Sequence, residues 1–166
     1  MVKIMDNFTD MLEEAENIHD VFSLVKDAVR ETIKESRAGI NLGLIELGNP
    51  DKGFLGAYYP VGSNIIVMNK TPIRRIAETN PDLMKPYLFS VLLHEYLHSL
   101  GYLKEEDTRK LTHMVTRQVF GDDHIVTELS GNLNKFLPYL IYPGGFPQTE
   151  NEITLIEDTE DLSYID

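Results

Sequence analysis

The stretch LLHEYLHSLGY, residues 92–102, sets leucines and two histidines at intervals of three and four residues. This spacing returns the same kind of side chain to one face of an α-helix, and the leucines can anchor that helix in a core. We expect the helix to run from about Asp82 to Leu100. Gly101 is expected to end it, because glycine readily adopts the left-handed backbone that closes many helices.

The flanking segments predict an α+β fold with a single domain over residues 1–142. Residues 6–36 carry apolar side chains at helical spacing and form either one helix or two joined helices. Residues 38–48 alternate like a strand, and residues 54–69 resemble a hairpin turning near Pro60, so we expect a small antiparallel sheet. Further helices are expected around Ile73 and Ile76, over 104–120 and, more weakly, over 125–142.

The last part of the chain differs in composition from the rest. Residues 150–166 hold seven acidic and no basic residues. We therefore expect residues 143–166 to form an acidic, loosely ordered tail. Its apolar ITLI stretch, residues 153–156, could instead add to a sheet edge or occupy a cleft, since extended peptides bind by strand addition.

The overall composition excludes several classes of function. The 166 residues include no cysteine, and the net charge is −12. Disulfides and thiol catalysis are therefore excluded, and a metal would have to bind through His, Asp or Glu. The negative charge argues against nucleic acid or an anionic membrane as a partner. Residues 1–20 lack an apolar signal segment and no stretch reaches membrane-spanning length, so we expect a cytoplasmic location.

Two histidines and a glutamate form the strongest functional pattern. His94 and His98 lie one helical turn apart, so both imidazoles project from the same face. This spacing allows one nitrogen of each ring to bind a single Zn²⁺ at about 2.0–2.1 Å. From the next position on the helix, the Glu95 carboxylate can reach a water molecule activated by the metal. A chance pattern is the alternative, but burying these three groups in an apolar helix without a purpose is costly.

The segment His94-Glu95-Tyr96-Leu97-His98 with Gly101 resembles the H-E-x-x-H-x-x-G motif of the zincin superfamily of metallopeptidases. The stretch GAYYPVGSNIIVMN, residues 56–69, is similar to the edge strand that precedes the metal helix in many zincins and pairs there with the substrate. The resemblance covers about residues 54–120. It implies that His94 and His98 bind zinc, that Glu95 is the general base, and that the strand near residues 63–69 borders the cleft.

The motif leaves the third metal ligand open. Metzincins place it six residues after the second histidine, and that position is Lys104 here. A bacterial RNA-processing metalloprotein family with the similar motif H-G-x-L-H-L-x-G-Y-x-H also has its third histidine there. Gluzincins instead take a glutamate from the following helix, which begins in this chain with Glu105, Glu106 and Asp107.

Helical phase ranks these candidates. The apolar stripe of the following helix comprises Leu111, Met114, Val115 and Val119. Asp107 is closest in phase to that stripe, whereas Glu105 flanks it and has the longer side chain. We choose Glu105 as the third ligand, with Asp107, Glu106, His113 and His124 as alternatives.

Three other side chains have less specific roles. Tyr102 could donate a hydrogen bond to an oxyanion, although packing is favoured. Arg109 and Arg117 lie on a polar helical face and are expected to pair with neighbouring acids.

The sequence thus predicts a zinc-dependent metallopeptidase acting on a peptide or protein substrate. The alternative is a zincin-fold module that binds a metal or a protein partner without turnover; Lys104 favours this alternative, and the intact Glu95 favours catalysis. Hydrolysis of RNA is a third possibility that the negative charge disfavours. The oligomeric state is left open.

Overall fold

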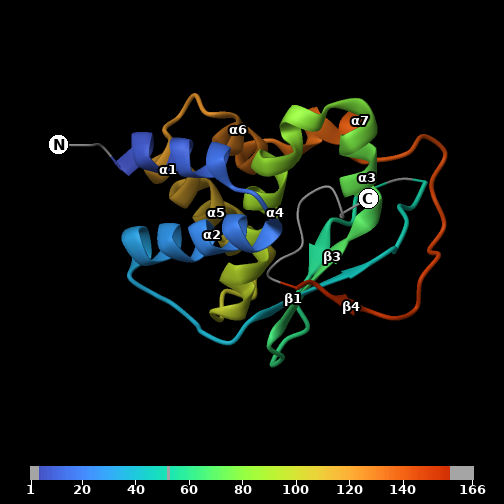
Figure 1. Ribbon diagram of the computed structural model, residues 1–166, viewed down its shortest axis with the longest axis horizontal. Coiled ribbons are helices and arrows are strands. Elements are labelled where there is room, and N and C mark those ends of the chain that lie inside the picture. Colours follow the sequence, from blue (N-terminus) through green and yellow to red (C-terminus); the bar gives the residue numbers. More distant parts are fainter. Residues whose placement is uncertain (1–3, 52, 158–166) are drawn as a thin grey trace.

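The computed structural model describes residues 4–51 and 53–157 as one α+β domain (Figure 1). The predicted fold class is confirmed. The helices of the described residues are α1 (Ile4–Glu14), α2 (Ile18–Ile33), α3 (Lys70–Thr79), α4 (Met84–Ser99), α5 (Glu105–Phe120), α6 (Ile125–Gly131) and α7 (Leu137–Leu140), with short 3₁₀ turns at Pro81–Leu83 and Leu133–Phe136. The strands are β1 (Asn41–Ile45), β2 (Ala57–Tyr58), β3 (Ile65–Asn69) and β4 (Thr154–Leu155).

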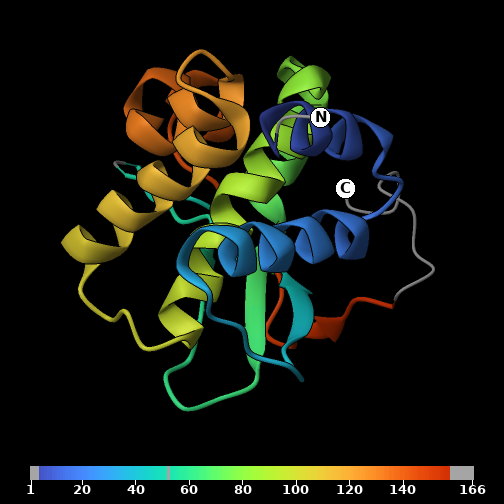
Figure 2. The same ribbon diagram turned by 90° about the vertical axis from the view of Figure 1, so that its left-hand side faces the viewer.

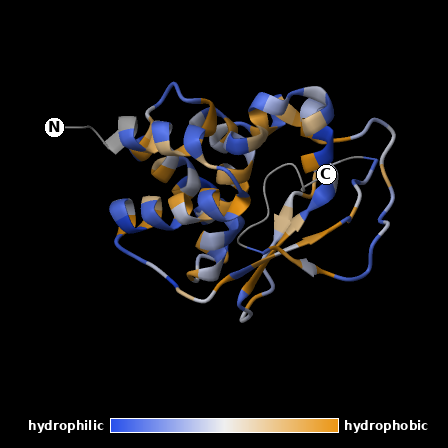
Figure 3. Cartoon of the chain, viewed as in Figure 1, coloured by the Kyte–Doolittle hydropathy of each residue, from blue (hydrophilic) through white to orange (hydrophobic). Residues whose placement is uncertain are grey.

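Helix α4 is the central element of the core. Its apolar residues point in all directions rather than along one stripe, as expected of a helix buried on most sides. It packs against α2, α5 and α6 (Figure 2), and Leu92, Leu93 and Leu97 are fully buried. Hydrophobic residues gather on the inward sides of the helices and along the strands (Figure 3). As predicted, the helix stops next to Gly101, whose φ is 109°.

The ends of the other helices follow from local sequence. Residues 6–36 form two helices, and the Asn17 side chain caps α2 by accepting a hydrogen bond from the Asp20 amide. Asn69 caps α3 in the same way through the Thr71 amide. Among the helices of the described residues, none combines the length and hydropathy needed to cross a membrane.

The sheet has the strand order β2-β3-β1-β4 and is mixed, which corrects the expected antiparallel sheet. Strand β1 pairs in parallel with β3, from Asn41 opposite Ile65 to Ile45 opposite Asn69. A parallel pair needs a long crossover, and residues 46–64 supply it. The alternation of side chains is the same for both directions of pairing, so the sequence pattern did not distinguish them.

The predicted hairpin is confirmed, because β2 pairs antiparallel with β3 and Pro60 lies in the turn between them. The expected place of the edge strand is wrong, however. Residues 65–69 form the inner strand β3, flanked on both sides, and the edge strand is the shorter β2. An inner position suits β3, since Ile66, Val67 and Met68 are fully buried.

The segment 143–157 returns to the sheet. Phe146 forms a β-bridge with Asn49, and Ile156 is 6% exposed in the core. Strand β4 pairs antiparallel with β1 at the sheet edge opposite β2. Strand addition, one of the two alternatives for residues 153–156, is therefore confirmed. Residues 158–166 of the predicted acidic tail lie outside the described residues.

Candidate metal centre

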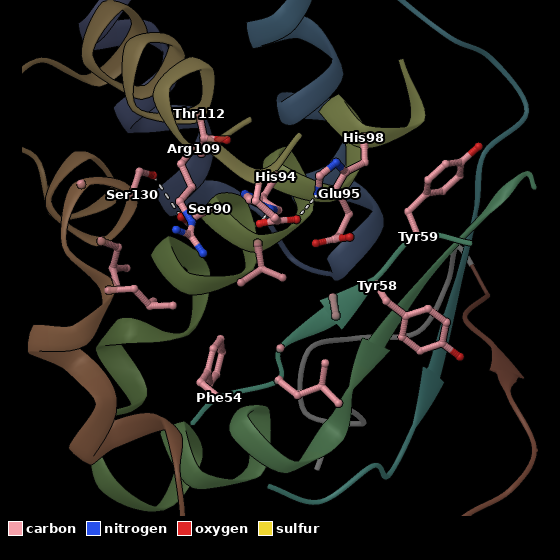
Figure 4. A pocket seen from close by; sticks show the side chains of 18 of the residues that line it. Phe54, Tyr58, Tyr59, Ser90, His94, Glu95, His98, Arg109, Thr112 and Ser130 are labelled. Atoms are coloured by element: carbon pink, nitrogen blue, oxygen red, sulfur yellow. Dashed lines mark hydrogen bonds and ion pairs between the residues drawn. The ribbon is translucent and has the colours of Figure 1, made fainter. Parts of the chain in front are cut away.

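A pocket of about 720 Å³ opens between β2, α4, α5 and the segment that follows α6 (Figure 4). His94, Glu95 and His98 of α4 line it, together with Glu105 of α5. Residues 54–59 form the facing wall. The edge strand that borders the pocket is therefore β2.

The two histidines present their Nε2 atoms to the same point. The ring centroids are 4.8 Å apart and the ring planes are nearly perpendicular. Both side chains are mostly buried, with 21% of His94 and 12% of His98 exposed. The i, i+4 spacing on α4 is sufficient to create this pair, because successive turns bring the two side chains to one face.

The Glu105 carboxylate lies at the point where the Nε2 atoms of the two histidines converge. Its Oε2 lies 3.1 Å from Nε2 of His94, and its Oε1 lies 2.8 Å from Nε2 of His98. These contacts hold the pKa of Glu105 below its usual value, against the opposing effect of burial. The chain reverses at Gly101 and starts α5 at Glu105 itself, which brings the carboxylate back to α4.

The buried face of α5 differs from the apolar stripe used to rank the ligands. It is formed by Thr108, Thr112, Val115, Thr116, Val119 and Phe120, whereas Leu111 and Met114 are only partly buried. At about 100° per residue, Glu105 lies within roughly 20° of the centre of this face. The threonines can be buried because the hydroxyls of Thr112 and Thr116 bond the carbonyl groups four residues earlier.

A backbone carbonyl orients His98. Its Nδ1 lies 2.7 Å from the carbonyl oxygen of Tyr102, which can only accept a hydrogen bond. Nδ1 therefore carries the proton, and in the neutral ring the lone pair of Nε2 is free to bind a metal. Thr108 donates to the same carbonyl at 2.8 Å and helps to fix its direction.

His94 is also suited to metal binding. Burial lowers its pKa from the usual value, and the neighbouring Glu105 opposes this effect. His98 and Arg109 add to the lowering. A lower pKa keeps the imidazole neutral near pH 7, which is the form that binds metals.

Glu95 is buried beside the histidines, with 7% of its surface exposed. One of its oxygens and one nitrogen of each histidine lie within 4.8 Å of one another. Burial and, to a smaller extent, the nearby Glu105 raise its pKa to about 8, while a backbone hydrogen bond from Tyr59 opposes both effects. A cation at the centre would lower this pKa again, since an opposite charge favours the carboxylate.

The set of donors matches a divalent metal ion. Two imidazole nitrogens and one carboxylate are a ligand set common to catalytic zinc sites, and such sets also bind other first-row metals. The His98–Tyr102 contact is the kind of outer hydrogen bond that accompanies metal-binding histidines. The residues therefore could hold a metal ion.

The alternative ligands lie elsewhere. Glu106 is exposed and pairs with Lys110 at 3.2 Å, and Asp107 is exposed next to it. His113 lies beside Gly131, a residue of the pocket wall, but does not itself line the pocket. His124 caps α6 by accepting a hydrogen bond from the Val126 amide at 3.1 Å and stacks on Phe120.

The remaining predicted side chains divide into two groups. The Tyr102 hydroxyl donates to Glu35, so it does not serve the pocket. Arg117 pairs with Asp122 at 2.7 Å, as expected. Arg109 behaves differently, because it lines the pocket next to His94. Arg109 follows Glu105 by four residues, one helical turn along the same face. This spacing is the signal in the sequence that indicates a place in the pocket.

Comparison with known protein families, with curated proteins and with solved structures found no match to this chain.

Proposed function

We propose that the protein is a zinc-dependent metallopeptidase in which His94, His98 and Glu105 bind the metal and Glu95 is the general base. The observation that carries this proposal is the convergence of both Nε2 atoms and the Glu105 carboxylate on one point, with Glu95 buried beside it. A third ligand supplied by the start of the next helix is also what the resemblance to gluzincins implies.

Bound at such a site, zinc would act as a Lewis acid that acidifies water and polarises a carbonyl oxygen. The protein provides the rest of the chemistry. Glu95 accepts a proton from the attacking water and returns it to the leaving amine. Its burial keeps bulk water away from the carboxylate. A hydrogen bond from the Tyr59 backbone helps to fix its position.

Strand β2 is suited to bind an extended substrate. It pairs with β3 on one side and forms the edge of the sheet on the other. A peptide can add to such an edge through main-chain hydrogen bonds. Because β2 also lines the pocket, a peptide bound there would pass the point at which His94 and His98 converge.

The second candidate is a module that binds a metal or a partner without turnover. It is favoured by the position of Tyr102, whose hydroxyl binds Glu35 and leaves the pocket without that donor for an oxyanion. The two functions differ in what Glu95 is for. A binding module has no use for a proton acceptor beside its metal.

The decisive experiment compares wild type with Glu95→Gln. Purified wild-type protein, loaded with Zn²⁺, is incubated with a peptide library, and the products are identified by mass spectrometry. We expect about one zinc per chain in both proteins and cleavage by wild type alone. Zinc binding with no cleavage by either protein would favour the binding module, and absence of zinc from wild type would reject the peptidase.

A further inference from the structure

Arg109 stands out among the charged side chains of the pocket. It is the one lysine or arginine among the described residues that line the pocket. Figure 4 shows its side chain entering from α5 on the side of Ser90 and Ser130, across from Tyr58 and Tyr59. It also acts on His94 through its positive charge. The guanidinium therefore faces the space that a substrate would occupy.

No partner within the described residues explains this side chain. The chain has six arginines, all within the described part. Five of them donate hydrogen bonds to other residues: Arg30, Arg37, Arg74, Arg75 and Arg117. Arg109 makes neither an ion pair nor a hydrogen bond with any described residue. Glu105, one turn earlier on the same helix, binds the two histidines instead.

The surroundings of Arg109 are polar but uncharged. Ser90 and Ser130 are joined by a hydrogen bond of 3.0 Å that connects α4 to α6 at the pocket wall. Asn132, Asn134 and Thr112 line the same region. These groups can accept or donate hydrogen bonds to a polar ligand. The nearest negative charges of the pocket, Glu95 and Glu105, belong to the metal centre.

We infer that Arg109 is a specificity residue that binds a carboxylate of the substrate. This inference rests on the proposed peptidase function. The planar guanidinium fits a carboxylate through two parallel hydrogen bonds. Among the described residues, the pocket holds one cationic side chain, and the chain as a whole carries a net charge of −12. Such a pocket suits one small anionic group and not a polyanion such as a nucleic acid.

The position of Arg109 defines which carboxylate it can reach. Arg109 follows Glu105 by four residues, which corresponds to a rise of about 6 Å along the axis of α5. An extended peptide advances about 3.4 Å per residue. With the scissile carbonyl at the metal, the carboxylate lies about one or two residues farther along the substrate. If Arg109 binds the terminal α-carboxylate of a peptide at that distance, the enzyme releases a single residue or a dipeptide from the C-terminus of its substrate.

The test measures binding, so it does not depend on turnover. Three pools of N-acetyl tetrapeptides are offered to zinc-loaded Glu95→Gln protein: free acids, the matching C-terminal amides, and amides with Asp or Glu in the last position. Retained peptides are quantified by mass spectrometry. We expect one carboxylate-bearing pool to be retained about five- to tenfold better than the neutral amides, as for a charge-assisted hydrogen bond at an exposed site.

Retention of the free acids identifies a terminal α-carboxylate, and retention of the third pool identifies an acidic side chain. Arg109→Gln on the same background should abolish the preference, and Arg109→Lys should keep part of it. Arg117→Gln is the matched control on α5 and should retain the full preference. Zinc content should stay the same in all variants.

Equal retention of all pools by the parent protein, including no retention, overturns the inference. An undiminished preference in Arg109→Gln also overturns it. The two proposals fail separately: a carboxylate preference in protein that binds no zinc supports the Arg109 site and rejects the peptidase. Cleavage by wild type without any carboxylate preference supports the peptidase and rejects the Arg109 site.

Discussion

The two edges of the sheet have different surroundings. Strand β2 forms one edge and lines the pocket with His94 and His98. The other edge is the short strand β4, from which the chain turns into the core at the buried Ile156. Exposed edges invite pairing with other chains, and an edge strand of only two residues limits that liability. We infer that the β2 edge serves binding and the β4 edge serves stability.

The largest expected effect is at the metal centre. His98→Ala removes a proposed ligand whose Nε2 lies 2.8 Å from Glu105, so we expect Zn²⁺ affinity to fall more than about a hundredfold. Zinc titration with a competing chelator measures the affinity. The matched control is His124→Ala, which should bind zinc like wild type. If His98→Ala retains zinc at wild-type affinity, the assignment of the β2 side to metal chemistry is wrong.

The next effect lies at the β4 edge. Ile156→Ala empties a site that is 6% exposed, so we expect the free energy of unfolding to fall by about 2–4 kcal/mol. Urea denaturation measures it. Zinc affinity in the folded state should remain unchanged, because Ile156 belongs to the opposite edge from the pocket. A large loss of zinc affinity with unchanged stability would contradict the division between the edges. Ile153→Ala, at an exposed position of the same segment, is the control and should cost much less.

A smaller effect depends on pH in metal-free protein. The pKa of Glu95 is about 8 in the folded state, above its value in the unfolded chain. The folded state therefore holds a proton that the unfolded chain releases, and stability falls as the pH rises from about 4.5 to about 8. Glu95→Gln lacks this penalty. In the presence of a chelator, we expect the variant to be more stable than wild type by a few kcal/mol above pH 8.

Urea denaturation at pH 4, 7 and 9 checks the expected difference between the two proteins. The difference should vanish at pH 4, where Glu95 is protonated in both states, and shrink on addition of Zn²⁺ at pH 9. An equal difference at every pH would mean that the substitution acts through packing rather than through the charge.

The smallest effect separates neighbours at the start of α5. Glu105→Ala should weaken zinc binding by about ten- to a hundredfold, a milder loss than that of a histidine because water can fill the position. Glu106→Ala is the matched control, since its side chain pairs with Lys110 on the exposed face. If the control loses as much affinity as Glu105→Ala, the effect comes from the charge at the helix start and not from ligation.

The sequence by itself determined the features that depend on local spacing. His94 and His98 share a face because they are four residues apart on α4, and Gly101 ends the helix through its own backbone conformation. The antiparallel hairpin of β2 and β3 follows from residues that are close in the chain. Each of these features is decided within about two turns of helix or one turn of a hairpin.

Only the tertiary structure decided how distant segments meet. The parallel pairing of β1 with β3 and the addition of β4 depend on which edges the rest of the chain leaves open. The buried face of α5 was set by its packing against α4 and α6, which accepts threonines that a hydropathy pattern counts as polar. That packing turns Glu105 toward His94 and His98 and Arg109 into the pocket. The acids at the start of α5 look equivalent in sequence, and the position of the helix relative to α4 is what distinguishes them.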